Sequence, residues 1–224
     1  MNYVIAASRP WYWSLGPELQ KHFARPFATV QREQDLDVAQ LRKLQPRYVF
    51  FPHWSTKIPA EIFDSFECVV FHMTDLPFGR GGSPLQNLIA RGIYETRISA
   101  LRCSPVLDGG PIYLKRPLSL EGNAEEIYVR AAGVIGEMIA HIVEHEPAPE
   151  PQTGEATVFR RRTPAESDIA SLADVRKVFD HIRMLDAEGY PHAFLETEHL
   201  RLEFRCASLS TDSVHAEVTI KRKP

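Results

Sequence analysis

The chain is poor in the features that mark several classes of protein. Its three cysteines, Cys68, Cys103 and Cys206, have no short spacing, which disfavours a disulfide framework and a cysteine-rich metal site. No apolar run approaches the ~18 residues of a membrane span. The first residues, MNYVIAASRPWYW, lack the basic and long apolar regions of a signal peptide. These absences favour a cytoplasmic protein without a membrane contact.

Positive charge is not in excess either. The chain has 26 Lys and Arg residues against 29 Asp and Glu residues, a formal net charge of -3. Because the basic residues are also scattered, we expect no nucleic-acid partner. Neither a Gly-x-Gly-x-x-Gly fingerprint nor a P-loop occurs, so the common motifs of nucleotide binding are missing. With 224 residues, of which 44% are hydrophobic, the chain is still able to build a packed core.

Short apolar runs alternating with helical segments dominate the first half of the chain. Strand-like runs occupy residues 3–7, 27–30, 48–51, 68–71, 98–103 and 112–114. Helical patterns occupy residues 15–23, 37–44 and 83–90, the last with Ser83 as its expected N-cap. This alternation predicts an α/β fold, with a Rossmann-like, mainly parallel sheet covered by helices on both faces.

The second half begins with the clearest helix, residues 123–145, which Asn123 and Glu126 are placed to cap. The proline-rich segment EPAPEPQTGE follows and reads as a stiff connector. Beyond it we expect a helix around residues 172–185 and strands near 200–204 and 215–220. We therefore predict a catalytic domain over residues 1–146, a connector over 147–157, and a small α+β region over 158–224.

Two predicted strands end at residues that carry chemistry. His72 stops the apolar run 68–71, and Asp108 precedes two glycines and a proline just before the strand at 112–114. Ligands of open α/β sheets bind at the carboxyl ends of strands, so an imidazole and a carboxylate there form a candidate acid/base pair. The structural alternatives are a packed histidine and an ordinary Asp-Gly-Gly-Pro turn.

The segment around His72, HMTDLPFGRGGSPLQNLI, resembles the His-x-x-Leu-Leu-Pro…Arg-Gly-x-Ser-Pro signature of the folate-dependent formyltransferases. The Asp-Gly-Gly-Pro segment falls where that family has Asp-x-Gly. RRTPAESDI and IRMLDAEGYPHAF resemble two later family segments, so the likeness runs in order from about residue 48 to 204. Within the family, the chain looks most like the short sugar-nucleotide N-formyltransferases of the pseudaminic acid type.

The resemblance implies transfer of a formyl group from the cosubstrate N10-formyltetrahydrofolate to the amine of a nucleotide-linked amino sugar, without a metal. It implies that His72 and Asp108 are catalytic. The folate-binding residues that it implies are Trp54, Ser55, Lys57, Ile58, Ser104, Val106 and Leu107. The candidate substrate-binding residues are Arg9, Trp11, Tyr12, Asp75, Phe78, Arg80 and Gly81. The partners expected are thus these small molecules, and a homodimer is left open.

Several alternatives stay open at this point. The family usually has an asparagine two residues before the histidine, and this chain has Val70, which leaves a catalytically silent folate- or nucleotide-binding homologue as an alternative. A formyltransferase for another small amine is the alternative within the same chemistry. Trp54 and Ile58 are equally compatible with plain core, and the aromatic residues of SRPWYWS with cover for a helix end. HIVEH, residues 141–145, formally fits the His-x-x-Glu-His zinc pattern.

Overall fold

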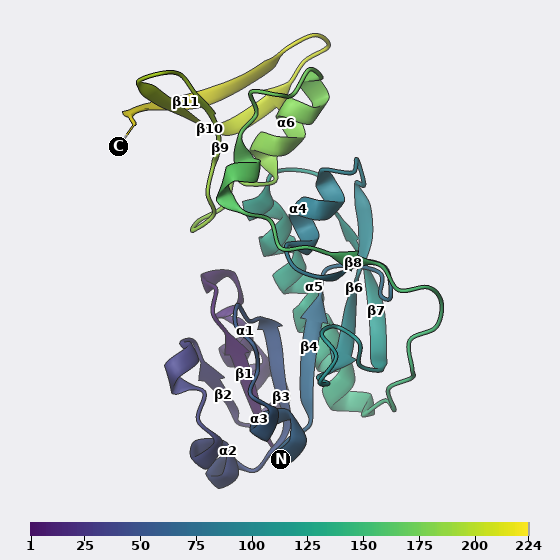
Figure 1. The fold of residues 1–224 in the computed structure, drawn as a ribbon. Helices are drawn as coiled ribbons and strands as arrows, with labels where there is room; N and C mark the ends of the chain where they lie inside the picture. The colour runs from purple at the N-terminus through teal and green to yellow at the C-terminus, as the bar shows by residue number, and fades with distance from the viewer. Residues whose placement is uncertain (224) are drawn as a thin grey trace. The chain divides into compact units, whose positions relative to one another are not determined.

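Six strands form the central sheet of the computed structural model, which describes residues 1–223 (Figure 1). In spatial order they are β2 (Phe27–Val30), β1 (Asn2–Ala7), β3 (Pro46–His53), β4 (Cys68–His72), β6 (Glu95–Arg102) and β7 (Ile112–Ser119). The pairs β1–β2, β1–β3 and β3–β4 are parallel, whereas β4–β6 is antiparallel. The prediction of a mainly parallel α/β sheet is therefore confirmed.

The strands read as continuous apolar runs because both faces of the sheet are buried. On one face, Val49 and Phe51 of β3 lie in a core cluster with Leu41 of α2 (Val38–Leu44) and Ile62 of α3 (Ala60–Ser65). On the other face, the ring of Phe50 lies near those of neighbouring strands. Since side chains alternate along a strand, His72 continues the face of β4 that carries Cys68 and Val70.

The remaining helices include α1 (Leu15–Phe23), α4 (Pro84–Ile89) and α5 (Ala124–His145). The predicted cap of α5 is confirmed, because the Glu126 amide donates to Asn123 Oδ1 and the Asn123 amide donates to Glu126 Oε2, both at 2.9 Å. Ser83 occupies the predicted N-cap position of α4, but its side chain makes no capping hydrogen bond. Ser83 has a left-handed backbone with φ 50°, and its hydroxyl accepts a hydrogen bond from the Arg162 amide instead.

The C-terminal part has the expected α+β composition. It contains α6 (Val175–Arg183) and a three-stranded antiparallel sheet of β9 (Ala193–Glu196), β10 (Leu200–Leu209) and β11 (Val214–Arg222). The two short strands β5 (Arg80–Gly81) and β8 (Val158–Phe159) form a further sheet. Strand β9 has no counterpart among the predicted elements.

The chain folds into two units, and segments of the two alternate along the sequence. Unit 1 comprises Met1–Arg80, Arg97–Leu118 and Val129–Val158, and unit 2 comprises Gly81–Thr96, Ser119–Tyr128 and the residues from Phe159 onward. The predicted domain boundaries at residues 146 and 158 remain a prediction. Within residues 1–223, no helix has both the length and the apolar character needed to cross a membrane.

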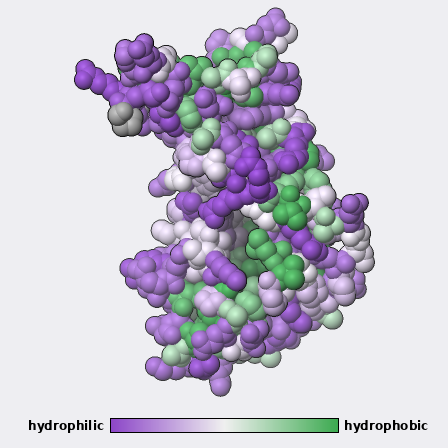
Figure 2. All heavy atoms as spheres, viewed as in Figure 1, coloured by the Kyte–Doolittle hydropathy of each residue, from purple (hydrophilic) through white to green (hydrophobic). Residues whose placement is uncertain are grey.

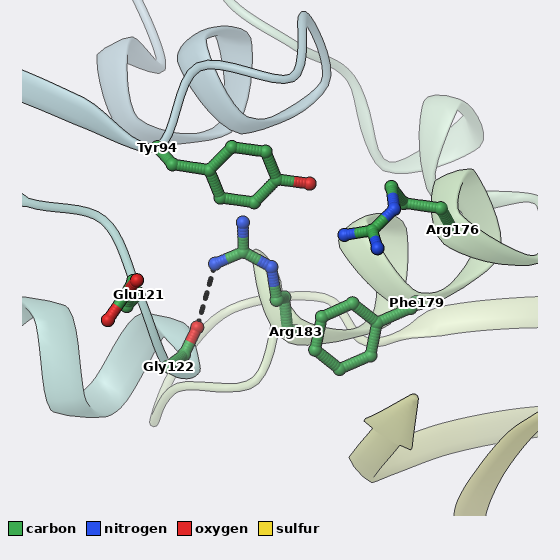
Figure 3. A pocket seen from close by; sticks show the side chains of 6 residues that line it. All are labelled: Tyr94, Glu121, Gly122, Arg176, Phe179 and Arg183. Carbon is green, nitrogen blue, oxygen red and sulfur yellow. Dashed lines mark hydrogen bonds between the residues drawn. The ribbon is translucent and has the colours of Figure 1, made fainter. Parts of the chain in front are cut away.

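Arg183 lines a cavity of about 310 Å³ inside unit 2 (Figure 3) and belongs to a buried ion pair. Arg183 Nε donates to Asp180 Oδ1 at 2.7 Å, and the two side chains are only 3% and 7% exposed. Arg183 Nη1 also donates to the carbonyl oxygens of Leu120 and Gly122. Arg183 therefore connects α6 to the loop before α5, while its Nη2 has no hydrogen-bond partner within the described chain.

We predict that Arg183→Met lowers the free energy of unfolding by about 3–5 kcal/mol, because it leaves the Asp180 carboxylate buried without its cation. Arg176 lies on the same helix and is exposed. Arg176→Met is the matched control and should stay within about 0.5 kcal/mol of the unchanged protein. Urea unfolding of both variants makes the comparison. Equal, small losses would show that the buried pair is unimportant for stability.

Burial also perturbs His53, the last residue of β3. Burial first, and then the positive charge of Arg9, lower the pKa of its imidazole from 6.5 to about 4. The unfolded chain therefore binds the proton more readily than the folded one between these values. The neutral His53 therefore contributes to the free energy of unfolding, by at most about 3 kcal/mol. This contribution is complete above about pH 6.5 and is lost as the pH falls toward 4.

We predict that His53→Gln flattens the loss of unfolding free energy between pH 7 and pH 4.5, relative to the unchanged protein. Urea denaturation at the two pH values measures this difference. His199, whose side chain is 81% exposed, supplies the control substitution His199→Gln. An unchanged pH dependence in His53→Gln would rule out His53 as its source.

Candidate active site at the strand ends of unit 1

His72 is the last residue of β4 and is only 7% exposed. Its Nε2 lies 2.8 Å from the carbonyl oxygen of Gly79, in the loop that follows the strand. Since a carbonyl oxygen can only accept, this contact requires a proton on Nε2. The chain thus turns back on itself so that its own backbone fixes the orientation of the imidazole.

The loop after β4 is anchored to the neighbouring strand. Ser99 of β6 lies opposite His72 in the antiparallel pairing and is fully buried. Its hydroxyl donates to the carbonyl oxygen of Thr74 at 2.8 Å and accepts a hydrogen bond from the Leu76 amide at 3.2 Å. One side chain therefore satisfies two backbone groups of a buried turn, which holds the position of Gly79 relative to His72.

Asp108 approaches the other nitrogen of the imidazole. Its Oδ2 lies 3.6 Å from His72 Nδ1, and its side chain is 14% exposed. Asp108 has a left-handed backbone with φ 51°, which is uncommon for a residue other than glycine. The structure thus brings together the two residues predicted as an acid/base pair, although the 35 residues between them include β6.

The glycines beside Asp108 are required by space. A Cβ atom on Gly110 would lie 1.8 Å from the carbonyl oxygen of Arg102, which rules out any side chain there unless the backbone moves.

Asp108 also affects the pKa of the Cys103 thiol. Burial first, opposed by a hydrogen bond involving the Ser104 backbone and reinforced by Asp108, raises the pKa of the Cys103 thiol to about 11. Cys103 is therefore a neutral thiol near pH 7.

The predicted folate-binding residues lie in two segments of unit 1. Ile58 is 7% exposed within the core cluster, and Trp54 packs against that cluster, as the core alternative describes. Trp54 Nε1 is nevertheless buried without a hydrogen-bond partner in the described part of the chain. Ser55 and Lys57 are exposed. Contacts of these four residues with folate remain predictions.

The second of these segments is the loop before Asp108. Ser104 Oγ donates to the carbonyl oxygen of Val106 at 2.9 Å. Val106 is 61% exposed and Leu107 is 71% exposed. Hydrophobic residues on the face shown in Figure 2 form small groups within a hydrophilic surface. Val106 and Leu107 thus expose two large apolar side chains next to the Asp108 carboxylate, a surface that a flat ligand could cover.

The aromatic residues predicted to bind substrate differ in accessibility. Tyr12 is buried at 1% exposure, and its ring lies 5.6 Å from that of His53. Trp11 is partly exposed and lies 6.4 Å from the same imidazole. Trp13 Nε1 donates to the carbonyl oxygen of Ala7, which fixes the turn after β1. Only Trp11 and Trp13 offer a ring surface, so Tyr12 fits the structural alternative better.

The other predicted substrate-binding residues are distributed around the loop after β4. Asp75 is paired with Lys115 at the surface. Phe78 is 36% exposed and Arg9 is partly exposed. Arg80 is partly buried and donates two hydrogen bonds to Gln152. Gly81 has φ 103° and belongs to unit 2.

Val70 remains the departure from the expected site. It is partly buried and packs against the core cluster on the same face of β4 as His72. Asn87 does not supply the missing amide, because its Nδ2 already donates to the carbonyl oxygens of Gly82, Ser83 and Arg160. Its Oδ1 accepts from Arg91. Asn87 therefore stabilises a turn of unit 2.

The His-x-x-Glu-His segment lies at the end of α5. The rings of His141 and His145 stack with their centroids 4.3 Å apart, and His145 Nδ1 contacts the carbonyl oxygen of His141. Within residues 1–223 no group of three potential ligand side chains is placed to hold a metal ion. The ring stacking and the contact within α5 are what the structural alternative describes.

One part of the site was missed by sequence reasoning. The proline-rich connector lies along the loops of unit 1, where Gln152 contacts both the Arg80 side chain and the backbone around Asp108. Thr157 accepts a hydrogen bond from the Gly79 amide. These contacts join residues more than 40 positions apart, so no local pattern in the sequence indicates them.

Comparison with known proteins identifies relatives over different parts of the chain. The family described as "Methionyl-tRNA formyltransferase, C-terminal domain" matches residues 164–221. A solved methionyl-tRNA formyltransferase from Clostridium thermocellum is 46% identical, covers 100% of both chains and superposes with a TM-score of 0.97. A curated methionyl-tRNA formyltransferase from Thermodesulfovibrio yellowstonii is 26% identical over 76% of this chain and 58% of its own length.

The sequence identity does not support the predicted likeness to the sugar N-formyltransferases. A solved sugar N-formyltransferase from a Shewanella species covers 94% of this chain and 99% of its own, with a TM-score of 0.73, but is only 14% identical, which shows a shared fold alone. The chain spans about half the length of the curated relatives that it matches. Identity of 46% over a complete relative nevertheless shows that the chain belongs to the formyltransferase family.

Proposed function

We propose that the protein is an N-formyltransferase that uses N10-formyltetrahydrofolate as its formyl donor. The observation that carries this proposal is the approach of His72, the last residue of β4, to Asp108, in the loop between β6 and β7. Nδ1 and Oδ2 lie 3.6 Å apart, in a chain of this family. Val106 and Leu107 are exposed apolar residues beside Asp108, and Trp54 Nε1 has no hydrogen-bond partner among residues 1–223; both features suit a flat ligand that also accepts hydrogen bonds.

The folate supplies the carbon that is transferred. The bond from this carbon to N10 breaks, a bond to the attacking amine forms, and a proton passes from the amine to N10, so that neither oxidation nor reduction occurs. The formyl oxygen bears negative charge during the exchange. A donor aimed at that oxygen stabilises the transition state by roughly 3–4 kcal/mol.

His72 is the proposed donor, and its geometry indicates how it would act. In the resting protein Nε2 donates to the neutral carbonyl of Gly79. A hydrogen bond to a charged oxygen is about twice as strong as one to a neutral oxygen. The developing oxyanion would therefore draw Nε2–H away from Gly79 as the reaction proceeds. Asp108, whose Oδ2 lies 3.6 Å from Nδ1, would assist the transfer of the amine proton.

For the acceptor we favour a nucleotide-linked amino sugar over a nucleic acid. Binding of RNA relies on lysine and arginine side chains that are available to neutralise phosphates. Many cations of the C-terminal part are instead paired with carboxylates. These pairs are Arg160–Glu166, Arg183–Asp180, Arg201–Glu196, Arg205–Glu217, Lys221–Glu203 and Lys223–Glu196. The formal charge of -3 supports the same choice.

Methionyl-tRNA is the second candidate acceptor. The relative that is 46% identical over its complete chain is described as a methionyl-tRNA formyltransferase, as are the curated relatives. Another small amine remains compatible with the same chemistry. A catalytically silent folate-binding homologue is the alternative suggested by Val70, which occupies the place of the family asparagine.

A turnover assay separates these acceptors. The full chain is incubated with N10-formyltetrahydrofolate and, in parallel, a panel of nucleotide-linked amino sugars or methionyl-tRNA, and release of tetrahydrofolate is followed. We expect turnover with a member of the sugar panel and not with methionyl-tRNA. Turnover with methionyl-tRNA alone would replace the acceptor but retain the chemistry. Folate binding without any transfer would leave the silent homologue.

We predict that His72→Ala abolishes turnover and that Asp108→Asn lowers it at least ~10²-fold, because both residues act on the transferred proton or the oxyanion. Both substrates should still bind within a few fold of their normal affinity, since the lost interactions belong to the transition state. Kinetics and calorimetry on the purified variants measure the two effects. A His72→Ala variant that retains more than about a tenth of normal turnover would assign His72 to structure alone.

A further inference from the structure

The proline-rich connector contributes to the site through residues 150–157, which we call the strap. At its start, Glu150 and Ile112 exchange backbone hydrogen bonds of 2.7 and 2.9 Å. At its end, Thr157 Oγ1 accepts a hydrogen bond from the Gly79 amide at 2.7 Å, and the Thr157 amide donates to the carbonyl oxygen of Pro77. The strap is thus attached to the first residue of β7 and to the loop after β4.

Gln152 lies in the middle of the strap and uses its whole side-chain amide. Its Oε1 accepts hydrogen bonds from Arg80 Nε at 3.1 Å and Arg80 Nη2 at 2.7 Å. Its Nε2 donates to the carbonyl oxygens of Asp108 and Gly110, both at 2.8 Å. Because a guanidinium can only donate and a carbonyl can only accept, only one orientation of the amide satisfies all four contacts.

We propose that Gln152 is a positioning residue for the reaction, which couples the orientation of the Arg80 guanidinium to that of the Asp108 carboxylate. This assignment rests on the proposed formyl transfer. Gln152 does not touch the reacting atoms itself. It acts through two residues on separate loops, Arg80 in the loop after β4 and Asp108 in the loop before β7.

The effect on Asp108 follows from its backbone. A residue with φ 51° sits in a left-handed conformation that costs free energy unless neighbouring contacts hold it. The two hydrogen bonds from Gln152 fix the carbonyl groups on both sides of Gly109, and the close approach of Gly110 to the Arg102 carbonyl oxygen limits movement from the other side. Loss of Gln152 would let the peptide relax and turn the carboxylate away from His72.

The effect on Arg80 follows from the neutrality of the amide. A carboxylate at position 152 would also hold the guanidinium, but it would cancel its charge. Arg80 Nε and Nη2 both donate to the neutral Oε1 of Gln152, which orients the guanidinium without placing a negative charge against it. We expect its remaining N–H groups to receive a phosphate of the acceptor, since guanidinium donors match phosphate oxygens in geometry and charge.

The test compares Gln152→Ala, Gln152→Glu and a control, Thr153→Ala, in the full chain. Thr153 is the next residue of the strap and is exposed. With the acceptor that the unchanged protein formylates, Gln152→Ala should lower kcat at least ~10-fold and raise the KM of the acceptor, while the KM of the folate changes less than ~3-fold. Gln152→Glu should raise the acceptor KM further, because its carboxylate neutralises Arg80. Thr153→Ala should match the unchanged protein.

A second readout uses the resting protein and needs no substrate. The Gly109 amide donates to the carbonyl oxygen of Val106 at 3.0 Å, inside the loop that Gln152 holds. Its hydrogen exchange, followed by NMR, should be faster in Gln152→Ala and unchanged in Thr153→Ala. The melting temperature of Gln152→Ala should fall by no more than ~4 °C, which separates a local loosening from general unfolding.

The outcomes distinguish this assignment from the formyl transfer on which it rests. An active enzyme in which Gln152→Ala stays within twofold in kcat and in acceptor KM overturns the assignment. If the unchanged protein transfers no formyl group to any acceptor, the proposed function fails. The hydrogen exchange of the Gly109 amide then tests by itself whether Gln152 positions the loop. Equal exchange rates in Gln152→Ala and Thr153→Ala would overturn the assignment.

Discussion

The site depends on one constraint, the enclosure of the His72 imidazole between a carbonyl oxygen and a carboxylate. Gly79 accepts from Nε2, and Asp108 faces Nδ1. Each of these groups lies on a loop, and a loop provides a fixed acceptor only if other contacts hold it. Ser99 fixes the turn after β4 from the neighbouring strand. The geometry of an active site at these strand ends is therefore a product of the sheet beneath it.

The two loops also depend on the strap. Thr157 binds the amide of Gly79, and Gln152 binds the carbonyl oxygens on both sides of Gly109. The imidazole, its carbonyl acceptor and its carboxylate partner are consequently linked through a segment that follows α5 in the sequence. A substitution of Gln152 is expected to alter the chemistry without touching any reacting atom, because its side chain joins the two loops.

The elements that sequence reasoning identified have strong local signals. Strands buried on both faces appear as apolar runs, and α5 combines a cap with a regular apolar face in which Ile127, Ile135 and Ile142 are fully buried. His72 and Asp108 were found because they interrupt such runs. The contacts of Gln152 were not predictable, because they pair a side chain with distant backbone groups. The contact of Ser83 was hidden for a related reason: Ser83 is the predicted N-cap of α4, but its hydroxyl accepts from the distant Arg162 amide and not from its own helix.

The chemistry and its acceptor rest on different kinds of support. Membership of the formyltransferase family and the arrangement around His72 concern the transferred group, whereas the acceptor depends on surface charge and on Arg80. The arrangement itself is tested most directly by ¹⁵N NMR of the histidine side chains, in which the shifts of the two ring nitrogens report which of them carries a proton. The structure predicts a protonated Nε2 on His72 in the resting protein, donating to Gly79. An Nε2 without a proton would contradict the orientation of the imidazole on which the proposed mechanism is built.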